Sequence, residues 1–425
     1  MMFTESRRRE LLDKIDRLVK KKFYDPSFKG RDWGSIVDGH RAKILSAADT
    51  VAFETSVNKM LSELGSSGLG LLSSTTRITP KNSISATFRA VETEYGNRWV
   101  FQDIHSGGPA AVAGVRRGDV LISIENRDIA PPEKPAFSMG RTHEVIVATV
   151  AGQAKVEISA PDPKHKENPC AVPDTVNTEV RDGVAAVKIP LFPGKLGIDF
   201  ARELSSVFEK HVNDADRLIL DLRGNPGGGI GGLRLMSLLV PDRRPVGFSL
   251  DRRTAERGFD KSRFPQFGRL PHSKMEIPLL ALRFARKKSV CLVTEGLGAR
   301  KFHGRVVVIV NEHTTCASEM VALFAREEAG AKIVGTATPG RLVSHTGFKL
   351  GDGFTLALPV AAYSSWNGTR LDGTGIQPDA IVDWSYSDAR RGIDNQLAAA
   401  VEIVSAMHGR EGEQPLTRLA HKSAG

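Results

Sequence analysis

Apolar residues near the start of the chain follow the spacing of amphipathic helices. One helical face is formed by Leu11, Leu12, Ile15, Leu18 and Val19, and a second by Phe53, Val57, Met60, Leu61 and Leu64. Recurrence at every third or fourth position is typical of an α-helix with one buried face. Gly65 is a good helix stop, and the Gly and Ser residues of 65–74 then break the pattern. The pattern predicts an N-terminal helical region, assigned to residues 1–80.

The next segment changes to short runs in which hydrophobic and polar residues alternate. These runs are residues 99–104, 120–124, 144–150 and 155–158. Alternation with a period of two predicts half-buried strands, so we assign a small β domain to residues 81–162. Inside it, the string SGGPAAVAGVRRGD at 106–119 predicts a short helix that starts at a Pro and ends at Gly114, followed by a Gly-Asp turn into the next strand.

Beyond a proline-rich linker at 161–173, predicted strands and helices alternate. The strands are 183–189, 218–222, 306–310 and 333–334, and the helices are 198–212, 231–239 and 317–328. This order predicts a layered α/β domain at residues 163–390. Near its end, residues 348–363 predict a β-hairpin that turns at Gly351-Asp352-Gly353. A closing helix at 393–407 belongs to a C-terminal segment, residues 391–425.

Composition indicates a globular protein of several domains. Of 425 residues, 40% are hydrophobic and 25% are charged, which argues against a disordered chain or a disulfide scaffold. No run approaches the roughly 20 apolar residues of a membrane helix, and the first 12 residues are too charged for a signal peptide. The chain as written is therefore expected in the cytoplasm, with a periplasmic or secreted protein whose leader was trimmed as the alternative.

Positive charge is concentrated in one segment. Residues 241–303 hold 15 Lys and Arg but 6 Asp and Glu, a net charge of +9 out of +10 for the whole chain. A basic segment can attract nucleic acid or an acidic peptide. Because aromatic residues are few and no nucleic-acid motif accompanies the charge, we expect no nucleic-acid partner. We interpret the segment as a solvated, mobile insertion that attracts or covers a substrate.

A glycine-rich turn, DLRGNPGGGIGG at 221–232, follows a predicted strand. Gly227, Gly229 and Gly232 fit GxGxxG, with Asp251 further on, so the turn could belong to a dinucleotide site. Pro226 interrupts the tight turn that such a site requires, and no second strand is evident before Asp251. The alternative is a turn whose backbone amides stabilise an oxyanion during acyl transfer.

A second turn, NEHTTCASE at 311–319, leads from a strand into an amphipathic helix. Cys316 lies at the helix start, where unpaired amides and the helix dipole favour a thiolate with a lowered pKa. The alternative is a small buried residue, the usual role of cysteine. Cys170 and Cys291 have no such setting and are interpreted as structural. No ligand spacing for a catalytic metal is present, and no cofactor is expected.

Together these motifs resemble the carboxyl-terminal processing peptidases, or tail-specific proteases. The resemblance rests on the PDZ-like string at 106–119, the DLRGNPGG turn, and the T-x-x-A-S-E turn that ends at Glu319. It implies a crotonase-like α/β core, a PDZ domain that captures the free C-termini of protein substrates, and a homodimer formed through the terminal helices. It also implies peptide hydrolysis by a Ser, Lys and Gln set, with oxyanion amides at the positions of Gly227, Gly228 and Ala317.

The chain departs from that family at each residue of the set. Cys316 occupies the serine position, Arg341 the lysine position and His345 the glutamine position. A related branch takes its base from the His of a Leu-Gly-x-Ser-His motif, and here Gly68 stands in its place.

We interpret these changes as one coupled replacement. Arginine stays protonated and cannot act as a base, whereas a thiol loses its proton far more readily than a hydroxyl. The hypothesis is a Cys316/His345 pair assisted by Arg341, with His313 as a rival base. Alternatively, Arg341 forms a structural ion pair with Glu319 or Asp372. The alternative function is a pseudoprotease that binds peptide C-termini without cutting them.

Overall fold

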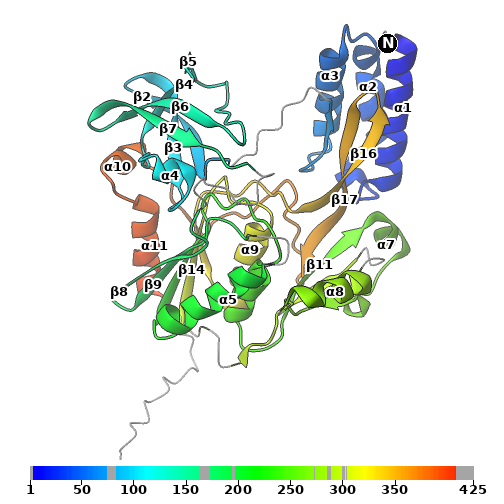
Figure 1. The fold of residues 1–425 in the computed structure, drawn as a ribbon. Helices are drawn as coiled ribbons and strands as arrows, with labels where there is room; N and C mark the ends of the chain where they lie inside the picture. The colour runs from blue at the N-terminus through cyan, green and yellow to red at the C-terminus, as the bar shows by residue number, and fades with distance from the viewer. Residues whose placement is uncertain are drawn as a thin grey trace, which may run out of the picture.

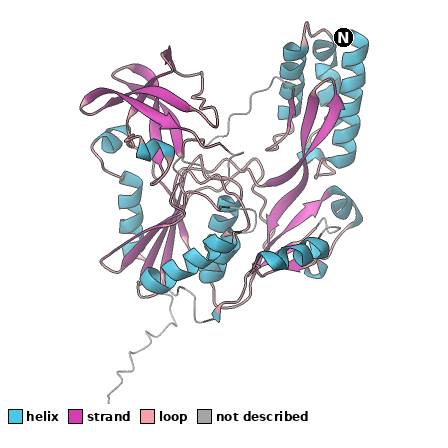
Figure 2. Cartoon of the chain, viewed as in Figure 1, coloured by secondary structure: helices cyan, strands magenta, loops and turns pink. Residues whose placement is uncertain are grey.

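The computed structural model describes residues 3–73, 83–162, 173–193, 197–271, 273–284, 289–298, 302 and 304–407. Most of the expected linker, together with Cys170, lies outside these residues. The described residues form three six-stranded sheets with helices packed around them (Figures 1 and 2). None of the helices described there has the length and apolar character needed to cross a bilayer.

The N-terminal helices pack on a hairpin that is distant in sequence. Apolar side chains of the helices, including Phe53, share a core with Leu356 and Leu358 of the hairpin, and Figure 1 shows α1 alongside it. The sequence assigned this hairpin to the α/β core, but its apolar residues complete the helical unit instead. The elements are α1 (Glu5–Lys22), η1 (Phe28–Gly30), α2 (Trp33–Leu45), α3 (Thr50–Ser62), β16 (Val343–Gly351) and β17 (Phe354–Ser365).

The β domain is an antiparallel sheet in the order β2-β3-β4-β6-β7, with β5 paired to β4. Its inner face packs on a core that includes Phe101, Leu121 and Val145. The described residues 129–141, between β5 and β6, contain no helix. The elements are β2 (Ala86–Thr93), β3 (Gly96–Ile104), α4 (Pro109–Val112), β4 (Val120–Ile124), β5 (Arg127–Asp128), β6 (Thr142–Thr149) and β7 (Gly152–Ser159).

The α/β core is a sheet in the order β18-β15-β14-β10-β9-β8, parallel except where β8 meets β9. Helices α5, α6 and α9 share a core with one face, and α11 covers the other. The strands are β8 (Asn177–Arg181), β9 (Val184–Lys188), β10 (Arg217–Asp221), β14 (Arg305–Val310), β15 (Lys332–Gly335) and β18 (Ala380–Ile381). The helices are α5 (Ile198–Val207), η2 (Phe208–Val212), α6 (Gly232–Leu238), α9 (Ala317–Ala329), α10 (Tyr386–Arg390) and α11 (Asn395–Ala406).

The interpretation of the basic segment as a mobile insertion is wrong for its described part. Its strand β11 lies between β17 and β13 in the third sheet, because Val246, Phe248 and Leu250 alternate into the interior. The surrounding charges obscured this short pattern in the sequence. The elements are β1 (Gly70–Leu72), which pairs with β17, and β11 (Pro245–Asp251), α7 (Arg252–Arg257), η3 (Lys261–Arg263), β12 (Gln266–Phe267), η4 (Lys274–Glu276), α8 (Ile277–Phe284) and β13 (Cys291–Val293).

Candidate active site

The two turns chosen from the sequence lie side by side at one edge of the core sheet. Strands β10 and β14 are parallel neighbours, so the turns that follow them meet at the same edge. The Thr315 amide donates to the Asn225 carbonyl at 3.0 Å, and the Thr315 hydroxyl donates to the Pro226 carbonyl at 3.0 Å. These bonds fix the glycine turn against the segment that carries Cys316.

Cys316 has a strained backbone at the start of α9. Its φ of 59° and ψ of −121° lie where L-residues with a side chain are rarely found. The Cys316 amide donates to the Glu319 carboxylate at 3.0 Å, which holds this conformation. The side chain is partly exposed. A strained residue between a strand and a helix presents its side chain outward, as nucleophiles of acyl-transfer enzymes require.

Two backbone amides converge on the sulfur. Hydrogen bonds from the amides of Ala317 and Gly228 act to lower the pKa of the Cys316 thiol. Amides placed in this way can also stabilise the oxyanion of a tetrahedral intermediate. Both residues were predicted from the sequence as oxyanion donors, and the structure brings them together with Cys316.

Gly227 contributes to the site in a way other than the one expected. Its amide donates to the Asn225 side chain at 2.8 Å, so the prediction that it is a free oxyanion donor is wrong. A Cβ at this position would lie 2.8 Å from the Cys316 Cβ, and its φ is +90°. The residue is glycine because the turn approaches Cys316 closely with a left-handed backbone.

The expectation of a lowered thiol pKa is wrong for this structure. Burial raises the pKa of Cys316, and the nearby Glu319 carboxylate raises it further. Together these two effects outweigh the two amides that lower the pKa. The sequence revealed the helix terminus but neither the burial nor the acidic neighbour. Cys316 is therefore a protonated thiol at neutral pH, and a reaction at this sulfur requires a base to take the proton.

Glu319 connects parts of the candidate site, a place that the sequence did not predict for it. It is fully buried and accepts hydrogen bonds from the Thr338 hydroxyl and the Gly340 and Arg341 amides at 2.6–2.7 Å, besides the Cys316 amide. It therefore joins Cys316 to the loop that carries Arg341. Its place three residues after the N-cap, the capping-box position, was the signal available in the sequence.

Arg341 lies in this loop with an exposed side chain. Its backbone, and not its guanidinium, binds Glu319. Within the described ranges, no ion pair joins Arg341 to Glu319 or Asp372, so the structural bridge considered from the sequence is wrong. Asp372 instead accepts hydrogen bonds from Tyr24, Ser66 and Ser67.

His345 lies on β16, exposed, beside a β-bulge. Its Nδ1 is 3.5 Å from the position that a Cβ of Gly68 would occupy. The imidazole therefore rests on the glycine at the histidine position of the Leu-Gly-x-Ser-His pattern. No hydrogen bond joins His345 to the Cys316 thiol among the residues that the structure describes.

The rival base His313 is engaged elsewhere. Its Nε2 lies 3.1 Å from the Gln102 side-chain oxygen, on β3 of the β domain. Its amide donates to Asn311 at 3.1 Å. The residue thus links the turn that carries Cys316 to the β domain, which disfavours it as the base.

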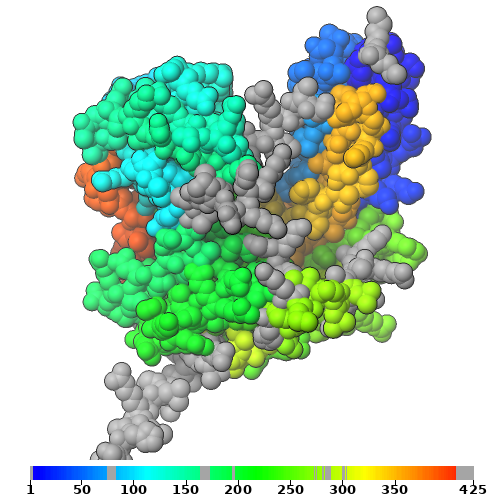
Figure 3. Space-filling view, in the orientation of Figure 1, coloured from blue at the N-terminus to red at the C-terminus, as the bar shows by residue number. Residues whose placement is uncertain are grey.

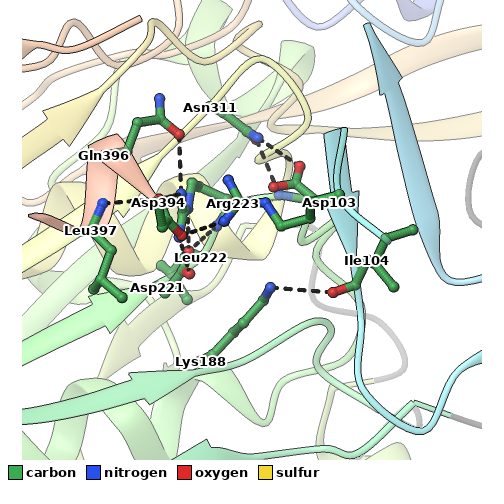
Figure 4. A network of polar contacts seen from close by, with 12 residues as sticks. Asp103, Ile104, Lys188, Asp221, Leu222, Arg223, Asn311, Asp394, Gln396 and Leu397 are labelled. Atoms are coloured by element: carbon green, nitrogen blue, oxygen red, sulfur yellow. Dashed lines mark hydrogen bonds and ion pairs between the residues drawn. The ribbon is translucent and has the colours of Figure 1, made fainter. Parts of the chain in front are cut away.

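A polar network behind the turns joins them to the β domain and to α11 (Figure 4). Asp103 of β3 accepts from the Asn311 side chain at 2.8 Å, and Asn311 in turn accepts from the Gly224 amide at 3.0 Å. Buried Arg223 binds Asp221 and Asp394, which pairs the glycine turn with the start of α11. Because most of these charges are buried and paired, this side of the site is rigid.

The dinucleotide interpretation is not supported by the turn. The Gly229 amide donates to the Phe192 carbonyl at 3.0 Å, and the Gly227 amide is already bound, so neither is available to a phosphate. Asp251 caps α7 by accepting from Thr254. No cluster of metal-ligating side chains is found within the described part of the chain.

Sequence comparisons identify the core. The profile of peptidase family S41 matches residues 183–382, from β9 to β18. Over these residues, which make up just under half of the chain, the protein is similar to peptidase family S41. The profile of the tricorn protease C1 domain matches residues 4–62, the segment of α1 to α3.

Relatives found by comparison of whole sequences are named as proteases. The carboxyl-terminal-processing protease of Synechocystis is 22% identical over 440 residues, covering 99% of this chain and 93% of that protein. The carboxy-terminal processing protease of Bacillus subtilis is 24% identical over 311 residues, covering 71% and 57%. A tricorn protease homologue from Streptomyces coelicolor is 24% identical over 411 residues, but the chain spans only 31% of its length.

Solved structures share the fold. The photosystem II D1 C-terminal processing protease has a TM-score of 0.52 at 18% identity, covering 90% of this chain and 96% of that chain. Mature CPAF complexed with lactacystin has a TM-score of 0.52 at 12% identity, covering 93% and 98%. The architecture is thus that of solved S41 protease structures.

Proposed function

We propose that the protein is a peptidase that cuts protein substrates near their C-termini with Cys316 as the nucleophile. The observation that carries this proposal is the strained Cys316, with the amides of Gly228 and Ala317 directed at its sulfur. The relatives named as C-terminal processing proteases support the substrate class. A small buried cysteine without a function would not need a left-handed backbone or converging amides.

The chemistry is acyl transfer in two steps. The sulfur attacks the scissile carbonyl carbon as a base removes the thiol proton, and the oxyanion forms against the amides of Gly228 and Ala317. The base returns the proton to the leaving amine, which departs and leaves a thioester on Cys316. Water then attacks the thioester with the same base accepting its proton. The C–S bond breaks, the new C-terminal carboxylate is released, and the base returns the proton to the Cys316 sulfur.

We assign the base to His345. Because the Cys316 thiol is protonated at rest, proton removal accompanies attack, and imidazole is suited to this at neutral pH. Glu319 supports this assignment, because it binds both Cys316 and the loop that leads to β16, the strand that carries His345. The location of His345 against Gly68 adds support, because a related branch of the family has its histidine at the position of Gly68. Arg341 contributes positive charge near the reacting groups.

We further propose that the β domain acts as a PDZ-like module. Its sheet offers edge strands to which an extended peptide could add by main-chain hydrogen bonds. The network from Asp103 to Asn311 supports a fixed distance between such a peptide and Cys316. The homodimer through the terminal helices remains part of this proposal.

The test is turnover of a protein substrate with a free apolar C-terminus by the parent and two variants. Cys316→Ala should abolish cleavage, since it removes the atom that attacks. Cys316→Ser should lower kcat strongly, because a hydroxyl is harder to deprotonate with imidazole alone. Thioester trapping by mass spectrometry should find the acyl group on Cys316 only in the parent. Cleavage that survives Cys316→Ala removes the proposal.

One observation favours a second function, a pseudoprotease that binds peptide tails. Burial raises the pKa of Cys316, and Arg341 cannot act as a base. Calorimetric binding of the same tail, without cleavage over hours and without an acyl intermediate, would establish this alternative. Cleavage by the parent excludes it.

A further inference from the structure

Helix α8 and the turn before it expose a row of large apolar side chains. Met275, Leu279 and Leu282 are 89%, 72% and 77% exposed. Leu279 and Leu282 are three residues apart in α8 and so share one face, and Met275 lies in η4 directly before the helix. An isolated exposed Leu is ordinary, but three large exposed apolar side chains within eight residues indicate an interaction surface.

Positive charge accompanies this row. The segment 241–303 has a net charge of +9, and Arg253, Arg257 and Arg263 are exposed on α7 and η3. Figure 1 shows α7 and α8 in the same lower part of the molecule, and Figure 3 shows the yellow-green surface of this segment facing outward. We define the basic apolar surface as Met275, Leu279 and Leu282 together with Arg253 and Arg257.

We propose that the basic apolar surface docks the protein reversibly on an anionic lipid bilayer. Aliphatic side chains of α8 enter the boundary between headgroups and acyl chains, while the arginines lie at the level of the anionic headgroups. Such a helix lies in the interface without spanning it, which agrees with the absence of a spanning helix among the described residues.

The charge argues against a second copy of the chain on the same surface. A two-fold contact would bring two segments of +9 together, and like charges at an interface repel. The exposed row also lacks the Tyr and Trp anchors of tight protein interfaces. A bilayer supplies both the complementary charge and a deformable apolar phase, so it fits both features.

The experiment is co-sedimentation of the full chain with vesicles. Phosphatidylcholine vesicles are compared with vesicles containing about 30% phosphatidylserine, which mimics an anionic leaflet. We expect at least tenfold stronger partitioning to the anionic vesicles, and weaker binding as salt is raised because screening reduces the attraction. Equal or absent binding to both vesicle types overturns the proposal.

Matched variants separate the two features. Leu279→Ser with Leu282→Ser should reduce partitioning about tenfold, as should Arg253→Gln with Arg257→Gln. The control is Val51→Ser with Val112→Ser, which removes apolar side chains that are 63% and 69% exposed on other elements, and it should bind like the parent. Thermal unfolding checks that each variant folds.

If the parent instead self-associates in sedimentation velocity and the leucine variant does not, a second copy occupies the surface and the proposal fails. No readout uses peptidase activity, so this result is independent of the proposed function.

Discussion

The two halves of the candidate site are built very differently. The nucleophile half consists of two adjacent turns whose backbone and side chains are tied by short hydrogen bonds, with Glu319 and Asn311 fully buried between them. The half assigned to proton transfer consists of exposed side chains, Arg341 and His345, at the start of a hairpin that packs on the N-terminal helices.

This difference separates the stabilisation of charge from the handling of protons. Donors that are fixed before substrate arrives need no reorganisation as the oxyanion forms. An exposed imidazole on a strand of another unit can adjust, and catalytic contacts often tighten only with substrate bound. We therefore expect changes in the rigid half to cost more activity than changes in the exposed half.

Among changes to the rigid half of the site, we expect Gly228→Ala to reduce activity the most. The added Cβ would lie 2.1 Å from the Phe192 carbonyl oxygen, and the φ of +134° does not suit alanine. The turn must shift, which displaces an oxyanion amide. Loss of one such donor costs about 10²–10³ in kcat, and displacement of the turn adds to this, so kcat/KM for a tailed peptide should fall about 10³-fold or more.

The matched control is Gly39→Ala in α2. No atom lies within 4 Å of its added Cβ, and its φ is not positive. This variant should keep parental activity and unfold at an equal or higher temperature, since alanine favours the helix. Parental activity in Gly228→Ala would show that the glycine turn takes no part in catalysis.

In the exposed half, His345→Ala should lower kcat about 10²-fold, the lower range for loss of a general base. The pH–rate profile should also lose the limb that reports imidazole ionisation, which a purely structural role would not produce. His211→Ala, at an exposed histidine on η2, should change neither kcat nor the profile. If His345→Ala retains the parental profile, the base is another group.

The same contrast explains what could be predicted from sequence. The strand, turn and helix around Cys316 are local patterns, so the sequence predicted them. The resemblance to the peptidase family implied Gly228 and Ala317 as donors, and their amides do bind the Cys316 sulfur. Glu319 was missed because its partners Thr338, Gly340 and Arg341 lie 19–22 residues away. No local pattern encodes such contacts, and burial, which sets the sign of the Cys316 pKa shift, is likewise a tertiary property.

The predictions for the β16–β17 hairpin and for the basic segment were wrong for related reasons. The hairpin was recognised from its alternation and its Gly351-Asp352-Gly353 turn, but its partner helices are about 300 residues earlier in the chain. In the basic segment, β13 has only three residues, Cys291–Val293, and becomes a strand because β11 and β12 pair with it. Short strands that depend on their neighbours carry too little local signal.

A buried histidine beside the glycine turn predicts how the stability of the folded protein depends on pH. His105 is fully buried against Gly224, and neither ring nitrogen has a hydrogen-bond partner among the described residues. Burial, with Lys188 nearby, lowers its pKa from 6.5 to about 4, although Asp103 and Asp221 act in the opposite direction.

Between pH 6.5 and about 4, His105 is therefore protonated in the unfolded chain and neutral in the folded chain. The stability is fully present above pH 6.5 and is lost as pH falls toward 4, by about 3 kcal/mol. Urea unfolding at several pH values measures how the free energy of unfolding changes with pH. His105→Leu should make this change smaller, whereas His211→Ala should leave the contribution of His105 unchanged. An unchanged slope in His105→Leu would mean that other groups cause the acid sensitivity.

The smallest expected effect is that of Arg341→Gln. The Arg341 backbone amide, which Glu319 binds, is kept in this variant, and only the exposed guanidinium is lost. An exposed charge is screened by water and salt, so it contributes little to a neighbouring transition state. We expect kcat/KM to fall less than about tenfold, with the difference narrowing at high salt. Arg341→Lys, which keeps the charge, should restore most of this loss. A drop as large as that of Gly228→Ala would place Arg341 within the rigid half, in direct contact with the reacting groups, and would end the division of the site into two halves.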